Sequence, residues 1–384
     1  MSTDSAEVQL SRLATSPAPP RLVWVFLLLF GMSQFFVDPE PGLPEFLFPI
    51  LLLFVSQRAL TNPAIMLLLA GNIAAMVIEL IVFGSASWSL LSLYLTLTSA
   101  ALLAIFQRYD LYECARAVLV GGGLGAAVTL AVLATPLAHE AYRYGIRFTG
   151  FFKDPNVTAP TALFFAIALF AIHGRSRWMA VFPFVVFAIS LSRATYLAAA
   201  VAAVYVLFFR NRVLAIFGVL IIATGALFLD QITAAVDALF QSIGRQGLVN
   251  AYDSDRTSNW QELVNLSWRS GVPLGPGFSE ANGMSTHSTY LRLLVEQGFI
   301  VLILFVAALW ISWRSAKSVA VRAALLCVAF NGIVIDATHW RVLFVAIALA
   351  LAWSAPTIRF PSDRHEVPQP RHLRKRFDGR GKQS

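Results

Sequence analysis

Residues 253–298 of the chain read DSDRTSNWQELVNLSWRSGVPLGPGFSEANGMSTHSTYLRLLVEQG. This stretch is the longest segment that could not be buried in lipid, because it combines charged side chains with a Gly/Pro-rich turn. On both sides of it the sequence consists largely of apolar blocks of about 15–20 residues, the length that crosses a hydrocarbon core as a helix. We therefore expect this segment to be the largest water-exposed part of a membrane protein and the first place to look for chemistry.

The composition of the chain is that of a membrane protein. Of the 384 residues, 58% are hydrophobic and 13% are charged, and the mean hydropathy is +0.69. Globular domains are about half apolar and about a quarter charged. The sequence thus predicts an all-α polytopic membrane protein with about twelve transmembrane helices and one long outer loop that carries short helices. The transmembrane helices are expected near residues 22–36, 43–56, 63–83, 86–106, 117–134, 157–173, 179–192, 194–209, 213–229, 298–313, 323–338 and 342–355.

Positive charge predicts the orientation. If the N-terminus is cytoplasmic, 20 of the 29 Lys and Arg residues fall on the cytoplasmic side, as the positive-inside rule requires. We therefore expect both termini in the cytoplasm. The predicted organisation is a cytoplasmic N-terminal segment at 1–21, a transmembrane domain at 22–356 with its long outer loop at 230–297, and a disordered basic cytoplasmic tail at 357–384.

The basic tail has two readings. It could be attracted to the anionic inner leaflet of the membrane, or it could bind nucleic acid. No folded nucleic-acid-binding module accompanies it, so we predict membrane lipids and no nucleic acid as its partners.

The two cysteines say little about function. Cys114 falls in a short polar connection between predicted helices, and Cys327 falls inside an apolar block. Neither a disulfide nor a cysteine-bound metal is therefore expected.

Nine cationic residues remain on the outer side, where they oppose the topology signal. Several of them are therefore expected to serve the function. The alternative is that they reach lipid phosphates or pair with nearby aspartates. The nine are Arg143, Arg147, Lys153, Arg193, Arg245, Arg256, Arg269, Arg292 and Arg341.

Two outer patches precede the long loop. In the first, YGIRFTGFFKDPN at 144–156, Asp-Pro-Asn is typical of a helix start and Gly150 would let the backbone approach a ligand. Arg147 and Lys153 favour anion binding there, although an ordinary turn is the alternative. The second patch ends at Arg193, after an apolar block of roughly 20 Å that is too short to cross fully. An ionisable residue at that depth is a candidate for function or for a structural ion pair.

The third patch is the long loop itself. Residues 230–243 have apolar side chains at helical spacing, which predicts an amphipathic helix lying on the membrane. SNWQ at 258–261 has the form of a capping box and predicts a short helix that continues to Trp268. Arg256 would then lie just ahead of free backbone N–H groups at the positive end of the helix dipole, an arrangement suited to a diphosphate.

His287 follows at the start of a further predicted helix, 288–298. A helix N-terminus disfavours imidazolium, so the ring should be neutral and able to accept a proton. A solvated or hydrogen-bonded histidine is the alternative. Nearby there is no second His, Cys or Asp set at metal-ligand spacing and no Gly-rich phosphate loop, so no metal or other cofactor is predicted.

These patches together resemble a known family. RFTGFFKDPN at 147–156 looks like an R-x-x-G-x-F…P-N start of a span, and SLSRATY at 190–196 looks like an S-x-S-R-[GA] turn. The loop motifs at 256–260, 275–278 and 287–298 follow in the same order. Over roughly residues 145–310 the chain resembles the bacterial O-antigen ligase and O-antigen polymerase superfamily, which consists of polytopic glycosyltransferases of the C fold.

The resemblance implies an activity and a role for each matching residue. It implies an inverting, metal-independent transfer of a glycan from a polyprenyl diphosphate carrier, at the periplasmic face of the bacterial inner membrane, with 230–297 as a periplasmic loop. His287 would accept the proton of the acceptor hydroxyl. The residues that would hold the diphosphate are Arg193 and Arg256, helped by Arg147 or Lys153. The supporting residues would be Trp260, Asn156 and Ser288.

Three functions fit this reading. The first is a polysaccharide polymerase that joins lipid-linked repeat units into an O-antigen or exopolysaccharide. The second is a ligase that passes finished glycan to a lipid or protein acceptor, and the third is a transporter or flippase for the same carrier. Few charges fall inside the predicted helices, Glu79 and Asp336 being the clear cases, which favours an enzyme over a transporter. The expected partners are a polyprenyl-diphosphate-linked glycan, a glycan or lipid acceptor, and export or chain-length-control proteins.

Overall fold

The computed structural model describes most of the chain, and its regular structure is helical apart from one short strand pair. The described residues are 16–36, 43–84, 87–143, 147–152, 154–172, 175–227, 254–271, 273–275, 278, 286, 288–333 and 341–353. Within them, two strands of two residues each, β1 (Tyr142–Arg143) and β2 (Arg147–Phe148), pair antiparallel, with Tyr142 opposite Phe148.

The elements follow the chain in this order. The first group is α2 (Arg21–Ser33), α3 (Leu43–Leu52), α4 (Gln57–Leu60), α5 (Pro63–Phe83), α6 (Ser87–Arg108), α7 (Leu111–Ala131), η1 (Val132–Ala134) and η2 (Pro136–His139). The middle group is β1 (Tyr142–Arg143), β2 (Arg147–Phe148), α8 (Pro155–Ala171), η3 (Arg175–Ala180), α9 (Val181–Ile189), α10 (Arg193–Arg210) and α11 (Arg212–Leu227). The last group is α13 (Ser254–Ser270), α15 (Thr289–Arg292), the π-helical turn η4 (Leu293–Gln297), α16 (Phe299–Ser315), α17 (Val319–Asn331) and α18 (Arg341–Ala352).

The described helices have the apolar character of a membrane protein. Three stretches among them are long and apolar enough to cross a membrane, namely Pro63–Ile81, Ser89–Arg108 and Leu111–Ala134. Shorter apolar helices of 10–17 residues accompany them. Apolar side chains also cover outer surfaces, as on α11, where Val213 is 61% and Ile216 60% exposed. Such a surface suits lipid and not water. The predicted helical membrane protein is thus confirmed, and the number of about twelve spans stays a prediction.

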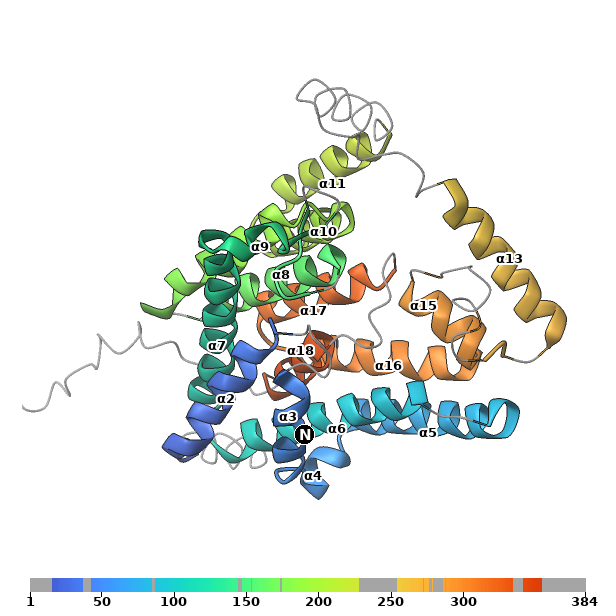
Figure 1. Cartoon of the computed structure of the whole chain (residues 1–384), viewed down its shortest axis with the longest axis horizontal. Helices are drawn as coiled ribbons and strands as arrows, with labels where there is room; N and C mark the ends of the chain where they lie inside the picture. Colours follow the sequence, from blue (N-terminus) through green and yellow to red (C-terminus); the bar gives the residue numbers. More distant parts are fainter. Residues whose placement is uncertain are drawn as a thin grey trace, which may run out of the picture.

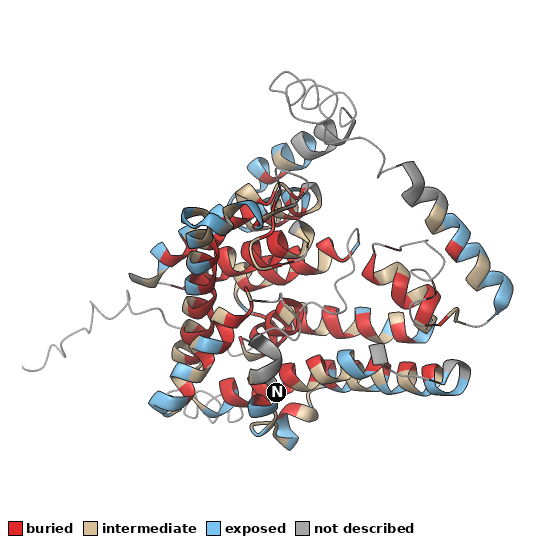
Figure 2. Cartoon of the chain, in the orientation of Figure 1, coloured by how far each residue is buried: buried red, intermediate tan, exposed pale blue. Residues whose placement is uncertain are grey.

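Helix α18 lies at the centre of the molecule, packed against α6, α16 and α17 (Figure 1). Every residue from Val342 to Leu351 is buried, and Figure 2 shows this helix within the buried interior. A helix that is apolar all round belongs inside a larger protein or in lipid. Here other helices surround it, so α18 is a core element on which the neighbouring helices pack.

Glycines let α2 and α7 approach closely. A Cβ atom built on Gly121 would lie 2.0 Å from the backbone oxygen of Leu28. One built on Gly31 would lie 1.9 Å from the backbone oxygen of Val118. No side chain fits at these distances, so the two helix backbones are in direct contact, as small residues allow in membrane helices.

The prediction that Cys114 lies in a connection is wrong. Helix α7 begins at Leu111, where the side chain of Asp110 accepts a hydrogen bond of 2.9 Å from the N–H of Glu113. Cys114 therefore lies in the first turn of α7 and is buried. The predicted span began only at residue 117 because Arg116 interrupts the run of apolar residues. In the structure Arg116 faces outward and forms an ion pair of 3.5 Å with Glu113.

Several predicted features lie outside the described residues. They are most of the N-terminal segment 1–21, the amphipathic helix 230–243, the basic tail 357–384 and Asp336.

Candidate functional site

The segment before α8 is built as the Asp-Pro-Asn pattern predicts. Asp154 caps the helix, because its side chain accepts a hydrogen bond of 2.8 Å from the N–H of Asn156. The hydroxyl of Thr158 donates back to the carbonyl of Thr149 at 3.0 Å. Together these bonds fix the position of Asn156 at the start of the helix.

Gly150 is needed for packing between protein segments. Its φ is +58°, and a Cβ there would lie 2.2 Å from Cγ2 of Thr129 in α7. The sequence predicted that this glycine makes room for a ligand. The close neighbour is the side chain of α7, so the contact with protein already requires a glycine at this position.

The turn between α9 and α10 is short and strained. Helix α9 ends at Ile189 and α10 begins at Arg193, and between them Leu191 has a φ of 50°. This left-handed conformation is unfavourable for a residue with a side chain, by on the order of 1–3 kcal/mol, and such strain gathers at functional sites. The turn places Arg193 at the positive end of the α10 dipole.

A buried hydrogen-bond chain links this turn to α8 and α17. The hydroxyl of Ser192 donates to Oδ1 of Asn156 at 3.1 Å. The hydroxyl of Thr195 lies 3.0 Å from Oγ of Ser192 and 3.0 Å from Oδ1 of Asn331. Ser192, Thr195 and Asn331 are fully buried. The first and second predicted patches are therefore in direct contact.

Ser288 and Thr289 contact the residue that directly follows α17. Gly332, which directly follows Asn331, accepts hydrogen bonds from the N–H of Thr289 at 2.8 Å and from the hydroxyl of Ser288 at 3.5 Å. Ser288 also caps α15, as the predicted helix start required, by accepting from the N–H of Leu291. The C-terminal end of α17 thus joins the second and third patches.

Tyr290 strengthens the same contact. Its hydroxyl donates to the backbone oxygen of Ala329 in α17 at 2.8 Å. Burial raises the pKa of Tyr290 to about 12, since the phenolate would lose its hydration. The phenol is therefore neutral at physiological pH and remains a donor.

Helix α13 is tied to the residue before His287. The indole N–H of Trp260 donates to the backbone oxygen of Thr286 at 2.6 Å. Close by, the N–H of Leu274 donates to the oxygen of Val295 at 2.7 Å, which fastens the Gly/Pro-rich turn to η4. The long loop is thus attached to the segment that leads into α15.

The predicted helix start at Ser258 is wrong. Helix α13 begins at Ser254, so the S-x-x-Q pattern lies inside the helix, where its N–H groups are not free. Ser254 and Asp255 explain the earlier start, because both residue types favour the first positions of a helix. Arg256 accordingly lies within the first turn and not ahead of it, which removes the predicted convergence of Arg256 with free N–H groups at Ser258.

The predicted site residues are placed as follows. His287 and Lys153 lie outside the described residues, but His287 is flanked by Thr286 and Ser288, both of which are buried. The backbone alone is described for three cations: Arg147 in β2, Arg193 as the first residue of α10, and Arg256 in α13. Asn156, Trp260 and Ser288 all take part in the contacts that join the patches.

Sequence reasoning missed Thr195, Asn331 and Gly332. Charged residues were considered as candidates for the site, whereas neutral polar residues inside apolar blocks were not. Asn331 did carry a signal, because a buried amide among apolar residues needs hydrogen-bond partners. Its partner Thr195 is 136 positions away in sequence, so only the tertiary structure could name it.

Among the described residues, no group of three or more His, Cys, Asp or Glu side chains could hold a metal ion. A scan against protein-family models found no match for this chain, and a search of the curated proteins found none. The resemblance to the O-antigen ligase and polymerase superfamily therefore stays an expectation drawn from the sequence motifs.

Proposed function

We propose that this protein is a polysaccharide polymerase. It transfers a glycan from a polyprenyl diphosphate carrier to a hydroxyl of a glycan acceptor, at the periplasmic face of a bacterial inner membrane. The observation that supports this proposal is the buried chain of hydrogen bonds in which α17 joins the segment of Arg193 to the segment of His287. Three segments whose motifs resemble one glycosyltransferase family thereby meet at one place.

The proposed reaction is a direct displacement. The acceptor oxygen attacks the anomeric carbon, the bond from that carbon to the diphosphate oxygen breaks, and polyprenyl diphosphate leaves with the electron pair. His287 takes the proton of the acceptor hydroxyl as general base. Arg193 and Arg256, with Arg147 or Lys153, stabilise the charge that develops on the diphosphate.

The rigidity around the site supports this role. Buried polar groups are unfavourable unless their hydrogen bonds are made, and a satisfied network holds its members in one arrangement. Ser192 and Ser288 each belong to that network and each is next to a proposed functional residue, Arg193 and His287 respectively. Fixed neighbours are what a transferase needs to hold two substrates in register.

The membrane arrangement is part of the proposal. We propose about twelve spans with both termini in the cytoplasm and the loop 230–297 in the periplasm. The support is the charge bias of the sequence together with the apolar helices of the described residues. The carrier would then present its diphosphate at the side where Arg193 and His287 are proposed to lie.

Product analysis tests the proposal. Purified protein in liposomes receives a polyprenyl-diphosphate-linked oligosaccharide, and both the released lipid and the glycan length are measured with a chelator present. A polymerase releases polyprenyl diphosphate and lengthens the glycan by whole repeat units. Transfer only to an added lipid or protein acceptor would replace polymerase by ligase. Movement of the carrier between leaflets without release would replace the enzyme by a transporter.

A further inference from the structure

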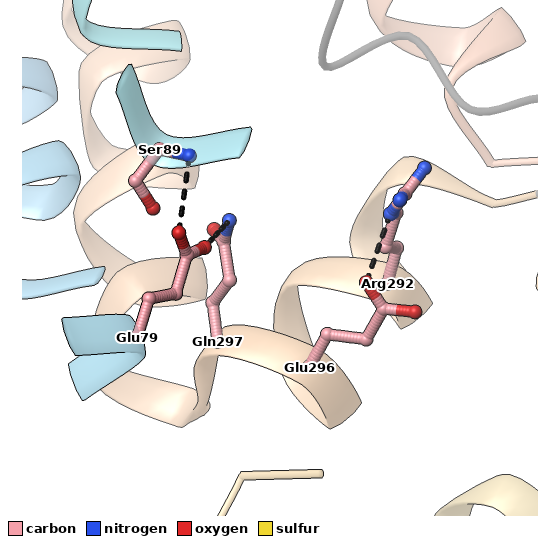
Figure 3. A network of polar contacts seen from close by, with 5 residues as sticks. All are labelled: Glu79, Ser89, Arg292, Glu296 and Gln297. Atoms are coloured by element: carbon pink, nitrogen blue, oxygen red, sulfur yellow. Dashed lines mark hydrogen bonds and ion pairs between the residues drawn. The ribbon is translucent and has the colours of Figure 1, made fainter. Parts of the chain in front are cut away.

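Two pairs of polar side chains, all buried except the partly exposed Gln297, hold the π-helical turn η4, which follows α15 (Figure 3). Nε of Arg292 donates to Oε2 of Glu296 at 3.0 Å, and these side chains are 9% and 2% exposed. Nε2 of Gln297 donates to Oε1 of Glu79 at 3.3 Å. The other oxygen of Glu79 accepts from the N–H of Ser89 at 3.3 Å. The Arg292–Glu296 pair therefore spans the turn from the last residue of α15, and Gln297 ties the last residue of η4 to α5.

The location of these groups argues against a passive role. Glu79 is fully buried and lies in α5, within the span Pro63–Ile81. Ionisable residues inside membrane helices are unfavourable and usually serve a function. A π-helical turn is also rare and is frequently found at functional sites. Both features meet at η4.

The turn is continuous with the candidate site. Helix α15 is only four residues long and runs directly into η4, so a rotation of η4 would move Ser288, which caps α15. At its far end η4 stops at Gly298, whose φ is +96° and where a Cβ would lie 3.1 Å from Cγ of Pro273. The turn is thus held from α5 on one side and from the Gly/Pro-rich segment on the other.

We propose that Glu79 and Glu296 are positioning residues for the segment that carries His287. Glu79 acts through Gln297, and Glu296 acts through Arg292; together they fix η4 so that α15 stays seated on Gly332. Neither carboxylate touches substrate in this account. The catalytic consequence rests on the proposed function, whereas the seating of α15 does not.

A charge swap tests the Glu79 pair. Gln297→Glu places two carboxylates against each other, which pushes η4 away from α5. Adding Glu79→Gln restores the pair, because the new amide can donate to the carboxylate at 297 while its oxygen accepts from Ser89. Thr96→Val is the matched control, since it breaks a bond of 2.8 Å between Asn72 in α5 and Thr96 in α6.

Disulfide formation reports the seating of α15 without any assay of activity. A Cβ at Gly332 would lie 3.3 Å from Oγ1 of Thr289, so cysteines at these two positions can form a disulfide. The background carries Cys114→Ala and Cys327→Ala. We expect Gln297→Glu to slow crosslinking at least about tenfold. The double variant Glu79→Gln/Gln297→Glu should crosslink at the parental rate, and so should the control Thr96→Val. A rate unaffected by Gln297→Glu overturns the inference.

A second measurement reports the position of α15 without the two introduced cysteines, in case the double-cysteine protein misfolds. Ser288 is 4% exposed, so a single Ser288→Cys should react slowly with a maleimide and faster when Gln297→Glu is added. The same swap series is then assayed for glycan transfer. We expect kcat to fall about 10- to 100-fold in Gln297→Glu, with KM for the carrier nearly constant, because small displacements of a reacting group have effects of that size.

The outcomes separate the two claims. If crosslinking and labelling respond as expected but no protein transfers glycan, the proposed function fails and the seating of α15 stands. If crosslinking slows while kcat keeps its parental value, the positioning role is overturned.

Discussion

At the residue scale, Asn331 holds together parts of the chain that are far apart in sequence. Its Oδ1 accepts from Thr195 at 3.0 Å, and its Nδ2 donates to the backbone oxygen of Cys327 at 2.9 Å. The residue is fully buried. A buried amide with both ends engaged has one orientation, so Asn331 fixes how α10 meets α17.

Replacing Asn331 should therefore weaken the protein. We expect Asn331→Leu to destabilise the fold by about 1–3 kcal/mol, because it removes an acceptor from a buried hydroxyl. The thermal midpoint of unfolding in detergent measures this. The double variant Thr195→Val/Asn331→Leu is the control: it removes both partners and should be less destabilised than the sum of the single variants. Full additivity would mean that the two side chains are not coupled.

Tyr290 gives a prediction for pH dependence. Its pKa in the folded protein is raised to about 12, against about 10 for a free phenol. Because the folded pKa is the higher one, the stabilisation is complete below about pH 10 and is lost as the pH rises towards about 12. Tyr290→Phe should have a lower thermal midpoint than the parent at pH 8, and the gap should narrow above pH 10. The other tyrosines are present in both proteins, so their titration affects both thermal midpoints alike. A difference in midpoint that stays constant with pH would contradict the burial of the Tyr290 phenol.

Local residue patterns predicted some of these details and not others. Asp154 and Ser288 cap helices at the predicted helix starts, because capping depends on neighbours two or three residues away. The contact of Ser192 with Asn156 spans 36 residues, and a motif cannot show which distant segments meet. The pattern at Ser258 was misleading, because Ser254 offered an earlier helix start of the same kind.

At the element scale, the closest packing is between α2 and α7. The contact depends on Gly121, above which the backbone oxygen of Leu28 leaves no room for a Cβ. Gly121→Ala should lower the thermal midpoint in detergent, since a backbone atom cannot move aside as a flexible side chain can. The matched control is Gly71→Ala in α5, where the Cβ would make an ordinary contact of 3.5 Å with Leu304.

The control should have a small effect of the opposite sign. Alanine is favoured over glycine in a helix by up to about 1 kcal/mol, so Gly71→Ala should leave the midpoint unchanged or raise it. Equal midpoints for the two alanine variants would contradict the direct backbone contact of α2 and α7.

Helix positions were more predictable than helix ends. The apolar run at 63–83 became α5 with the same bounds, because Asn62, Pro63 and Gly84 are strong local signals for a start and a stop. The run at 43–56 gave a shorter α3, which ends at Leu52. The π-helical turn η4 had no recognisable pattern, and its last residue contacts Glu79, more than 200 positions earlier.

At the scale of the whole molecule, the orientation in the membrane decides which face can meet a periplasmic substrate. A cysteine at Ser279, in the background without native cysteines, should be labelled by a membrane-impermeant maleimide in intact cells with a permeabilised outer membrane. Lys317→Cys, between α16 and α17, should be labelled only after lysis, because the charge bias places that connection in the cytoplasm. The reverse pattern would invert the proposed topology.

We propose that the segments of Arg193 and His287 form one site for glycan transfer. The most direct test is single-turnover release of polyprenyl diphosphate by purified parent, Arg193→Ala and His287→Ala proteins, each with a thermal midpoint checked against the parent. We expect rates lower by about 100-fold or more for both variants, the usual contribution of a general base or of an oxyanion contact. The control Arg269→Ala, at the exposed end of α13, should keep the parental rate. Parental rates for Arg193→Ala and His287→Ala would contradict the claim.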